Sequence, residues 1–113
     1  MGNSSSGKTK KQIREAFRLA VFTRDGFKCR ICGTHGDLDA HHITNRNQMP
    51  EGGYVVENGI ALCAKHHIDA EDAWCTQQNG KKMPVELAQF SPENLYRIIG
   101  SSKELARRKS MRL

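Results

Sequence analysis

Two short pairs of metal-binding residues constrain this chain more than any other feature of its sequence. Cys29 and Cys32 form a C-x2-C pair, and Cys63 and His66 form a C-x2-H pair after 30 intervening residues. A pair at this spacing can place both ligands on one side of a turn or helix start, and four such ligands suit tetrahedral Zn²⁺. We therefore predict a structural zinc site of composition Cys3His that joins two distant segments.

The size and composition of the chain are consistent with this zinc site. The 113 residues suffice for one domain, but only 37% of them are hydrophobic and 6% aromatic. Such a thin core often needs a structural metal or disulfides. The cysteine spacing favours metal binding in a reducing compartment over a disulfide framework, so we expect a cytoplasmic protein. We expect no membrane association, because no apolar stretch approaches the roughly 18 residues of a membrane span.

Charge is distributed unevenly along the chain, whose net charge is +6. Residues 1–30 hold eight basic and two acidic side chains, residues 31–102 hold five and nine, and residues 103–113 hold five and one. Basic ends around an acidic centre suit a cation site flanked by segments that bind phosphate. The alternative is a pair of solvated termini.

Local patterns predict an α+β fold. A capping-box pattern at Thr9 and Gln12, followed by an apolar stripe at helical spacing, predicts an N-terminal helix that ends near Asp25. The next expected elements are a hairpin or knuckle (27–32), a strand (38–43), a polar loop (44–57), a strand (59–62) and a helix (63–74). Ser91-Pro92-Glu93, and Ser101 with Glu104, predict the starts of two further helices.

We expect three segments along the chain: a disordered tail (1–8), a zinc-stapled finger (9–78), and a helical extension packed on the same domain (79–113). The tail runs into a phosphate-loop pattern, Gly2 to Thr9, that matches letter for letter. We reject this pattern because such a loop needs a preceding strand to aim its backbone N–H groups, and only Met1 precedes it.

Histidines carry the densest chemistry of the chain. His41 and His42 lie on a predicted strand, whose neighbouring side chains point to opposite faces. His67 follows His66 by one residue, a turn of about 100° on a helix. Two histidines converging from a strand and a helix can hold one divalent cation, and a third can remove a proton from water. We predict that His41 and His67 hold the ion and that His42 is the base.

The order of these residues resembles that of the HNH endonucleases of the ββα-metal, or His-Me finger, group. The resemblance spans roughly residues 17–72 and is carried by Cys29-x2-Cys32, His41-His42-Ile43, Gly52-Gly53, Asn58 and Leu62-Cys63-x2-His66-His67. It implies a small zinc-stapled ββα-metal finger that hydrolyses DNA phosphodiester bonds, leaving 5′-phosphate and 3′-hydroxyl ends. It also implies His42 as general base, His41 and His67 as ligands of Mg²⁺ or another divalent ion, and Asn58 as the residue that orients base and loop.

Several assignments stay open in the sequence. A second cysteine is more usual at the position of His66, so His66 and His67 can exchange roles, although the spacing of Cys63 and His66 favours His66 for zinc. Asn58 and the glycine after it also form a common turn dipeptide. Arg46 is either a clamp for the scissile phosphate or a solvated loop residue.

Four further titratable residues lie near these motifs, and two of them have alternative roles. Asp39 and Glu71 either fix the tautomer of a histidine or are simply exposed. We expect Cys75 in the core, as a small apolar residue, and His35 in a solvated turn.

The alternative function, of a different class, is a non-catalytic zinc module that binds nucleic acid or protein. Such a module accounts for the zinc ligands and the basic ends, but it gives no role to His41, His42 and His67. DNA is the expected partner and RNA stays open. The sequence leaves undetermined the oligomeric state, the sequence preference, nicking against double-strand cleavage, and the biological setting, whether phage packaging, restriction, mobile elements or repair.

Overall fold

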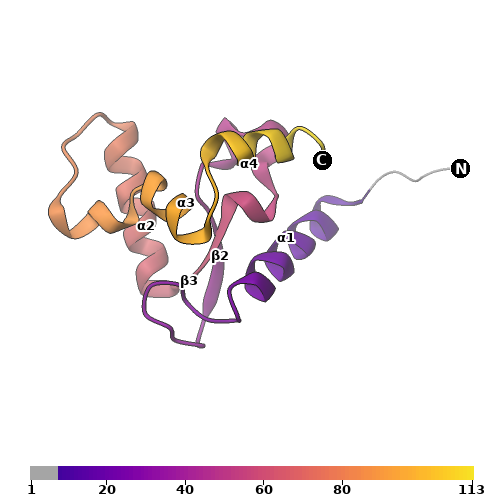
Figure 1. Cartoon of the computed structure of the whole chain (residues 1–113), viewed down its shortest axis with the longest axis horizontal. Helices are drawn as coiled ribbons and strands as arrows, with labels where there is room; N and C mark the ends of the chain where they lie inside the picture. The colour runs from indigo at the N-terminus through magenta and orange to yellow at the C-terminus, as the bar shows by residue number, and fades with distance from the viewer. Residues whose placement is uncertain (1–7) are drawn as a thin grey trace, which may run out of the picture.

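The computed structural model describes residues 8–113 and has an α+β architecture, as predicted (Figure 1). Strands β2 (Leu38–His42) and β3 (Gly59–Cys63) form an antiparallel sheet, with Leu38 opposite Cys63 and His42 opposite Gly59. The helices are α1 (Lys10–Arg24), α2 (Ala64–Gln78), α3 (Pro92–Ile99) and α4 (Lys103–Ser110). The predicted disordered tail and the phosphate-loop pattern fall mainly on residues 1–7, outside the described residues.

Helix α1 begins where its sequence predicts. The Thr9 hydroxyl accepts the backbone N–H of Gln12 at 3.1 Å, and the Gln12 side chain accepts that of Thr9 at 2.9 Å, a complete capping box. The helix packs against β3 at Gly59, where a Cβ atom would lie 2.5 Å from Cγ2 of Val21. Only glycine therefore allows α1 to approach the strand so closely.

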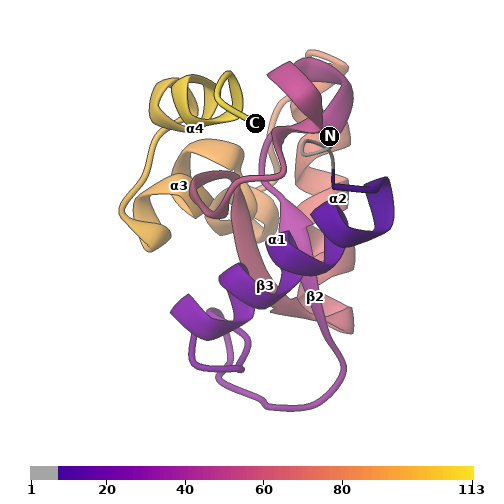
Figure 2. The ribbon, with the colours of Figure 1, turned by 90° about the vertical axis from the view of Figure 1, so that its right-hand side faces the viewer.

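The sheet separates two apolar clusters, because alternate strand residues point to opposite faces. Ala61 packs with Phe17, Val21 and Phe22 of α1. Ile60 and Leu62 pack on the other face, in a larger cluster that includes residues of α2, α3 and α4. Helix α1 thus covers one face of the sheet, whereas α2 and α3 cover the other (Figures 1 and 2). The two neighbouring histidines of β2 consequently meet different surroundings.

Turns rather than strands fill the segments around the sheet. The predicted knuckle at residues 27–32 is a series of turns with no strand pairing. The polar segment between the strands contains three short 3-10 helices, η1 (Arg46–Gln48), η2 (Pro50–Gly53) and η3 (Val56–Asn58). This loop is therefore an ordered part of the fold.

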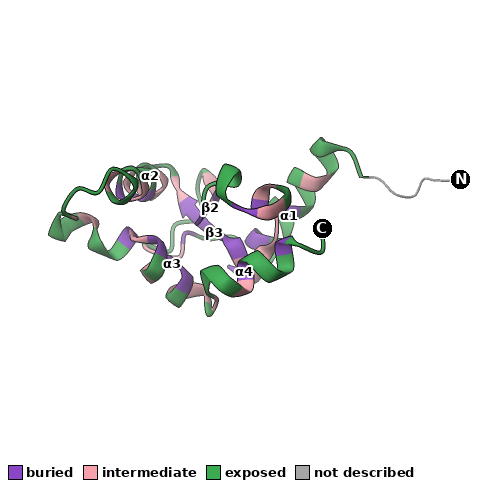
Figure 3. Cartoon of the chain, turned by 90° about the horizontal axis from the view of Figure 1, so that it is seen from above, coloured by how far each residue is buried: buried purple, intermediate pink, exposed green. Residues whose placement is uncertain are grey.

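The C-terminal segments pack on the larger of the two apolar clusters. The 3-10 helix η4 (Val85–Phe90) precedes α3, whose N-cap Ser91 accepts the N–H of Asn94 and whose C-cap Gly100 has φ of +70°. Figure 3 shows buried residues gathered where these elements face one another and exposed residues on their outer sides. Ser102 rather than Ser101 caps α4, because the Ser101 hydroxyl instead donates to the carbonyl of Glu57 at 2.8 Å.

Two expectations about α2 are corrected by the structure. Cys75 was expected in the core, but it is exposed, because Ala70 and Ala73 form the buried side of the helix. The helix also continues to Gln78, four residues beyond the predicted end, and stops at the turn containing Gly80. Within residues 8–113, no helix combines the length and apolar character that crossing a membrane requires.

Candidate metal centre and active site

The two predicted ligand pairs meet at the start of α2. The sulfur and nitrogen ligand atoms of Cys29, Cys32, Cys63 and His66 all lie within 4.8 Å of one another. The Sγ atoms of Cys32 and Cys63 are 3.9 Å apart, and Nδ1 of His66 lies 3.3 Å from Cys63 Sγ and 3.5 Å from Cys29 Sγ. Tetrahedral zinc, with its usual bond lengths, separates two sulfurs by about 3.8 Å and a sulfur from a nitrogen by about 3.6 Å. The donor set and its spacing therefore fit a structural zinc.

Local contacts prepare this Cys3His cluster for a metal. Burial raises the pKa of the Cys29 thiol, but backbone N–H groups of Cys32, Cys63 and Ile31 outweigh it and lower the pKa to about 6. Cys29 can therefore be a thiolate at neutral pH, the form that binds zinc. The His66 ring stacks on Phe90 of η4, with centroids 5.6 Å apart. This stacking holds the imidazole toward the cysteines.

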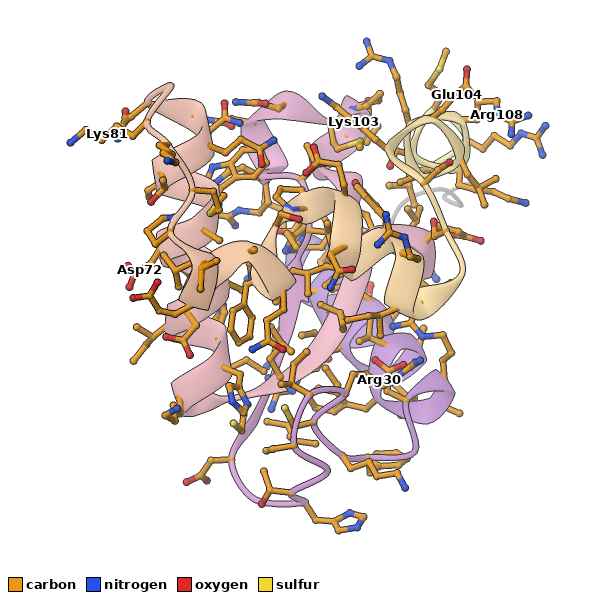
Figure 4. The ribbon with its side chains drawn as sticks, turned by 60° about the vertical axis from the view of Figure 1, so that its left-hand side comes forward. Arg30, Asp72, Lys81, Lys103, Glu104 and Arg108 are labelled. Carbon is orange, nitrogen blue, oxygen red and sulfur yellow. The ribbon has the colours of Figure 1, made fainter. Side chains whose placement is uncertain are left out.

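A buried ion-pair network anchors the knuckle to α1 and β3. The Asp25 carboxylate accepts hydrogen bonds from Arg24 at 2.7 and 2.8 Å, from Arg30 at 2.5 Å and from the backbone N–H of Ala61 at 2.8 Å. Arg30 also donates to the carbonyl of Ile98 at 2.9 Å, reaching from the knuckle toward α3 (Figure 4). The network ties the Cys29–Cys32 turn to three other elements, a role that sequence patterns did not indicate.

The structure separates His66 from His67. His66 joins the cysteines, whereas the ring of His67 lies edge-on to that of His41, with centroids 5.1 Å apart. Nδ1 of His67 lies 3.2 Å from an oxygen of Asp39, so Nε2 is the ring nitrogen that is left to bind an ion. The geometry thus favours His66 as the zinc ligand, and Asp39 takes the orienting position that the sequence left open.

A second group of metal-binding side chains forms between β2 and α2. Ligand atoms of His41, His67 and Glu71 lie within 4.8 Å of one another. Burial, followed by the charges of His67 and His42, lowers the pKa of His41 to about 3, so its imidazole is neutral at neutral pH. Two imidazoles and a carboxylate are suitable donors for a divalent ion. Glu71 was not predicted as a ligand, although its i+4 spacing from His67 is the signal that would have indicated it.

His42 occupies the opposite face of β2, the one covered by α1. Its ring stacks on Phe17, with centroids 4.5 Å apart, and meets Tyr54 edge-on at 4.7 Å. Burial, together with the positive charge of Arg46, lowers its pKa to about 4. Among the described residues, its Nε2 is buried and has no hydrogen-bond partner. His42 is therefore a neutral imidazole whose hydrogen-bonding capacity is not consumed by the fold.

A pocket of about 260 Å³ brings the two faces together at the edge of the sheet. It is lined by Arg14, Phe17, Arg18, Asp39, Ala40, His42, Arg46, Tyr54 and His67. His42 and His67 thus share one pocket, and His67 in turn contacts His41. Arg46 lies at the same pocket, where its guanidinium donates to the Tyr54 hydroxyl at 2.9 Å. Two of the three predicted histidines therefore line this opening, and the buried His41 lies behind it against His67.

Asn58 is fully buried and organises the backbone that follows His42. Its side-chain oxygen accepts the N–H of Thr44 at 3.1 Å and the hydroxyl of Tyr96 at 2.7 Å. Its amide nitrogen donates to the carbonyls of Thr44 at 3.1 Å and Gly53 at 3.2 Å. Gly53 has φ of +67°, and a Cβ there would lie 2.7 Å from Asn58 Nδ2. Asn58 therefore fixes the backbone at Thr44, two residues after the end of β2.

His35 lies apart from both clusters of metal-binding side chains. It is exposed in the turn after the knuckle, with Nδ1 2.9 Å from the carbonyl oxygen of Phe27. This placement agrees with the solvated turn expected for it.

Two antiparallel strands followed by a helix, with a Cys3His cluster at their base and a histidine cluster between strand and helix, define a ββα-metal finger. Residues 29–74 match a family model described as HNH endonuclease. The matched segment contains both clusters together with His42 and Asn58, so the predicted resemblance to this family is confirmed. No curated protein and no solved structure matched the chain.

Proposed function

We propose that this protein is a metal-dependent endonuclease that hydrolyses DNA phosphodiester bonds. The observation that carries the proposal is the pocket shared by His42 and His67, in which a neutral imidazole lies beside a set of divalent-ion ligands. The match to the HNH endonuclease family supports a nucleic acid as substrate. The release of 5′-phosphate and 3′-hydroxyl ends follows from the family resemblance.

His42 would be the general base. A neutral imidazole nitrogen of this residue would take a proton from the attacking water as the water's oxygen bonds to phosphorus. The bond between phosphorus and the 3′ oxygen would break, and that oxygen would leave as the 3′-hydroxyl after taking up a proton. The rings of Phe17 and Tyr54 hold the imidazole in place, so that little freedom has to be lost when substrate binds. Asn58 would support the base indirectly, by fixing the backbone at Thr44.

His41, His67 and Glu71 would hold Mg²⁺ or another divalent ion. A bound ion would stabilise the negative charge on the phosphate and the leaving oxygen. Asp39, at Nδ1 of His67, would keep the other ring nitrogen of His67 directed at the ion. The Cys3His cluster would hold zinc and keep the start of α2 joined to the knuckle.

Arg46 would position the scissile phosphate. Its side chain lies at the pocket that contains His42 and His67, and its contact with Tyr54 restricts its position. A guanidinium can donate two parallel hydrogen bonds to one phosphate, which a lysine cannot.

Cleavage of supercoiled plasmid, with Mg²⁺, Mn²⁺ or EDTA, tests the function. Replacing a general base typically slows a reaction by about 10²–10⁴-fold, and we expect this loss in His42→Ala with unchanged thermal unfolding. His35→Ala is the matched control, because His35 is exposed and lies outside both clusters. Cleavage by His42→Ala at the wild-type rate would refute the proposal. The same assay on RNA decides between the two nucleic acids.

Metal stoichiometry separates this function from that of a non-catalytic zinc module. Such a module needs one tightly bound zinc, whereas the nuclease also needs a second, exchangeable divalent ion. The group of His41, His67 and Glu71 favours the nuclease, because a binding module has no use for a second set of ligands. A titration that finds no second ion, in a protein that binds DNA without cutting it, would support the module.

A further inference from the structure

Helix α1 carries three exposed cations at four-residue spacing, Lys10, Arg14 and Arg18. Residues four apart are neighbours on a helix surface, and the helix rises about 6 Å per step, or about 12 Å from the first cation to the third. One strand of duplex DNA advances about 3.4 Å along its axis per nucleotide. The row is therefore long enough to lie along several successive phosphates.

These cations line two neighbouring pockets. Arg14 and Arg18 line the pocket that contains His42 and His67. Lys10 and Arg14 line a second pocket, of about 680 Å³, between α1 and the loop of η1 and η2. Arg14, Arg46 and Tyr54 belong to both pockets, so the two adjoin each other. A path thus runs from the candidate active site along α1 to its first turn.

The charge along this path is predominantly positive. Four cations line the two pockets, Lys10, Arg14, Arg18 and Arg46, against two acids, Asp39 and Glu51. Asp39 is already engaged by His67. The path therefore favours an extended anion over a neutral or cationic ligand.

Two of the cations are held in place by the fold. The guanidinium of Arg18 lies over the ring of Phe22, 4.7 Å from its centroid, and Arg46 donates to the hydroxyl of Tyr54. A cation that is already positioned loses less side-chain freedom when it binds a phosphate. The end of the path nearest the histidines is thus the more ordered part of the path.

We infer that α1, with the loop of η1 and η2, forms the track along which the DNA backbone reaches the pocket. Phosphates would contact Arg18 and Arg46 next to the histidines, then Arg14, then Lys10. The catalytic meaning of the track rests on the proposed function, but its binding of a polyanion does not. Because the contacts are to phosphates, the track holds DNA of any sequence.

Helix α4 supplies a matched comparison for the track. Arg107, Arg108 and Lys109 are also exposed and carry the same total charge, but they line neither of the two pockets. Figure 4 shows Arg108 on the outer side of α4. A protein that bound DNA by its net charge alone would use both helices, whereas the track assigns the binding to α1.

Binding of a short fluorescent duplex of mixed sequence, measured by anisotropy over a series of salt concentrations, tests the track. The α1 variant is Lys10→Gln, Arg14→Gln and Arg18→Gln; the α4 variant is Arg107→Gln, Arg108→Gln and Lys109→Gln. Losing three phosphate contacts should reduce the slope of log K against log salt by about 2.7 in the α1 variant. The α4 variant should change the slope by less than about 0.9, the value expected for one phosphate contact. Equal changes in both variants, or none in the α1 variant, would overturn the inference.

Two single substitutions test the same inference in case the triple variant does not fold. Arg14→Gln removes the cation that lines both pockets, and Lys11→Gln removes an exposed cation from the same helix that lines neither. Glutamine has nearly the same helix propensity as lysine and arginine, and thermal unfolding checks the fold of each variant. Only Arg14→Gln should weaken binding, and equal affinity of the two variants would count against the track.

The two proposals can fail separately, because binding is measured with no added divalent ion. If the wild-type protein binds through α1 but never cuts, the nuclease proposal fails and the track stands as a DNA-binding surface. If the protein cuts and the α1 variant still binds like wild type, the track fails alone. In a cleaving protein, the α1 variant should raise KM more than it lowers kcat, because uniform binding is lost.

Discussion

The hydroxyl of Tyr96 donates a 2.7 Å hydrogen bond to the side-chain oxygen of Asn58. Tyr96 lies on α3, 38 residues after Asn58, which ends η3 immediately before β3. The Thr44 hydroxyl lies 2.6 Å from the same Tyr96 oxygen, and since that oxygen donates to Asn58, Thr44 is the donor here. A residue of the C-terminal helices therefore helps to hold the loop that follows His42.

Removing the Tyr96 hydroxyl should destabilise the folded protein, although the group is small. Tyr96→Phe leaves Asn58 with one bond fewer and the buried Thr44 hydroxyl without its acceptor. We expect a loss of about 1–3 kcal/mol in the free energy of unfolding, measured with urea. Tyr54→Phe is the control, because the Tyr54 hydroxyl contacts the exposed Arg46 and its loss should cost less. Equal stability of Tyr96→Phe and wild type would contradict the structural role.

Asp39 should determine how tightly the divalent ion binds. Asp39→Asn removes the negative charge beside Nδ1 of His67, and losing such a partner typically weakens metal affinity by about 10–100-fold. The activation of cleavage by Mg²⁺ or Mn²⁺ should shift to higher ion concentration by this factor. Asp37→Asn, in an exposed residue two positions earlier, should leave the curve in place. Superimposed curves for wild type and Asp39→Asn would show that His67 does not need this carboxylate.

Zinc should be required for folding. In small zinc fingers the metal contributes on the order of 10 kcal/mol, comparable to the total stability of a small domain. We expect one zinc per chain by elemental analysis, loss of that zinc in Cys63→Ser, and loss of the cooperative thermal transition. Cys75→Ser is the matched control, because Cys75 is free and exposed, outside the cluster. A Cys63→Ser variant that keeps both zinc and transition would refute the Cys3His assignment.

Asp25 should make stability depend on acidity. Burial opposes ionisation of this carboxyl, but hydrogen bonds from Arg24, the N–H of Ala61 and Arg30 outweigh it and lower the pKa below the ordinary 3.8. Because the pKa of Asp25 is lower in the folded than in the unfolded protein, its ionisation stabilises the fold, and this contribution is fully present above the unfolded pKa. It is lost as the pH falls through the folded pKa.

The variant Asp25→Asn measures this contribution. Breaking a buried ion pair costs about 3–5 kcal/mol, and the lower end applies here because Arg24 and Arg30 are partly exposed. Urea unfolding at neutral pH should show the loss, and the acid dependence below about pH 4 should become flatter. Asp72→Asn, in an exposed residue on α2 (Figure 4), should change neither. An unchanged acid dependence in Asp25→Asn would mean that another carboxyl controls it.

Features that depend on residues close in the chain could be predicted from the sequence. The capping box at Thr9, the two strands, the start of α3 and the paired spacing of the zinc cluster all follow from local geometry. The opposite directions of His41 and His42 follow from the alternation of a strand. Even the choice of His66 over His67 for the cysteines was favoured by helical spacing.

Only the tertiary structure decided which distant side chains meet, because those contacts depend on how α1, α2 and α3 pack on the sheet. It placed Glu71 with the two histidines, Tyr96 against Asn58, and Arg14 and Arg18 of α1 along the pocket of His42. It also left Cys75 exposed and moved the cap of α4 to Ser102. Chain-local patterns specify the elements and their ligand pairs, whereas the contents of the site depend on the close packing of elements far apart in the sequence.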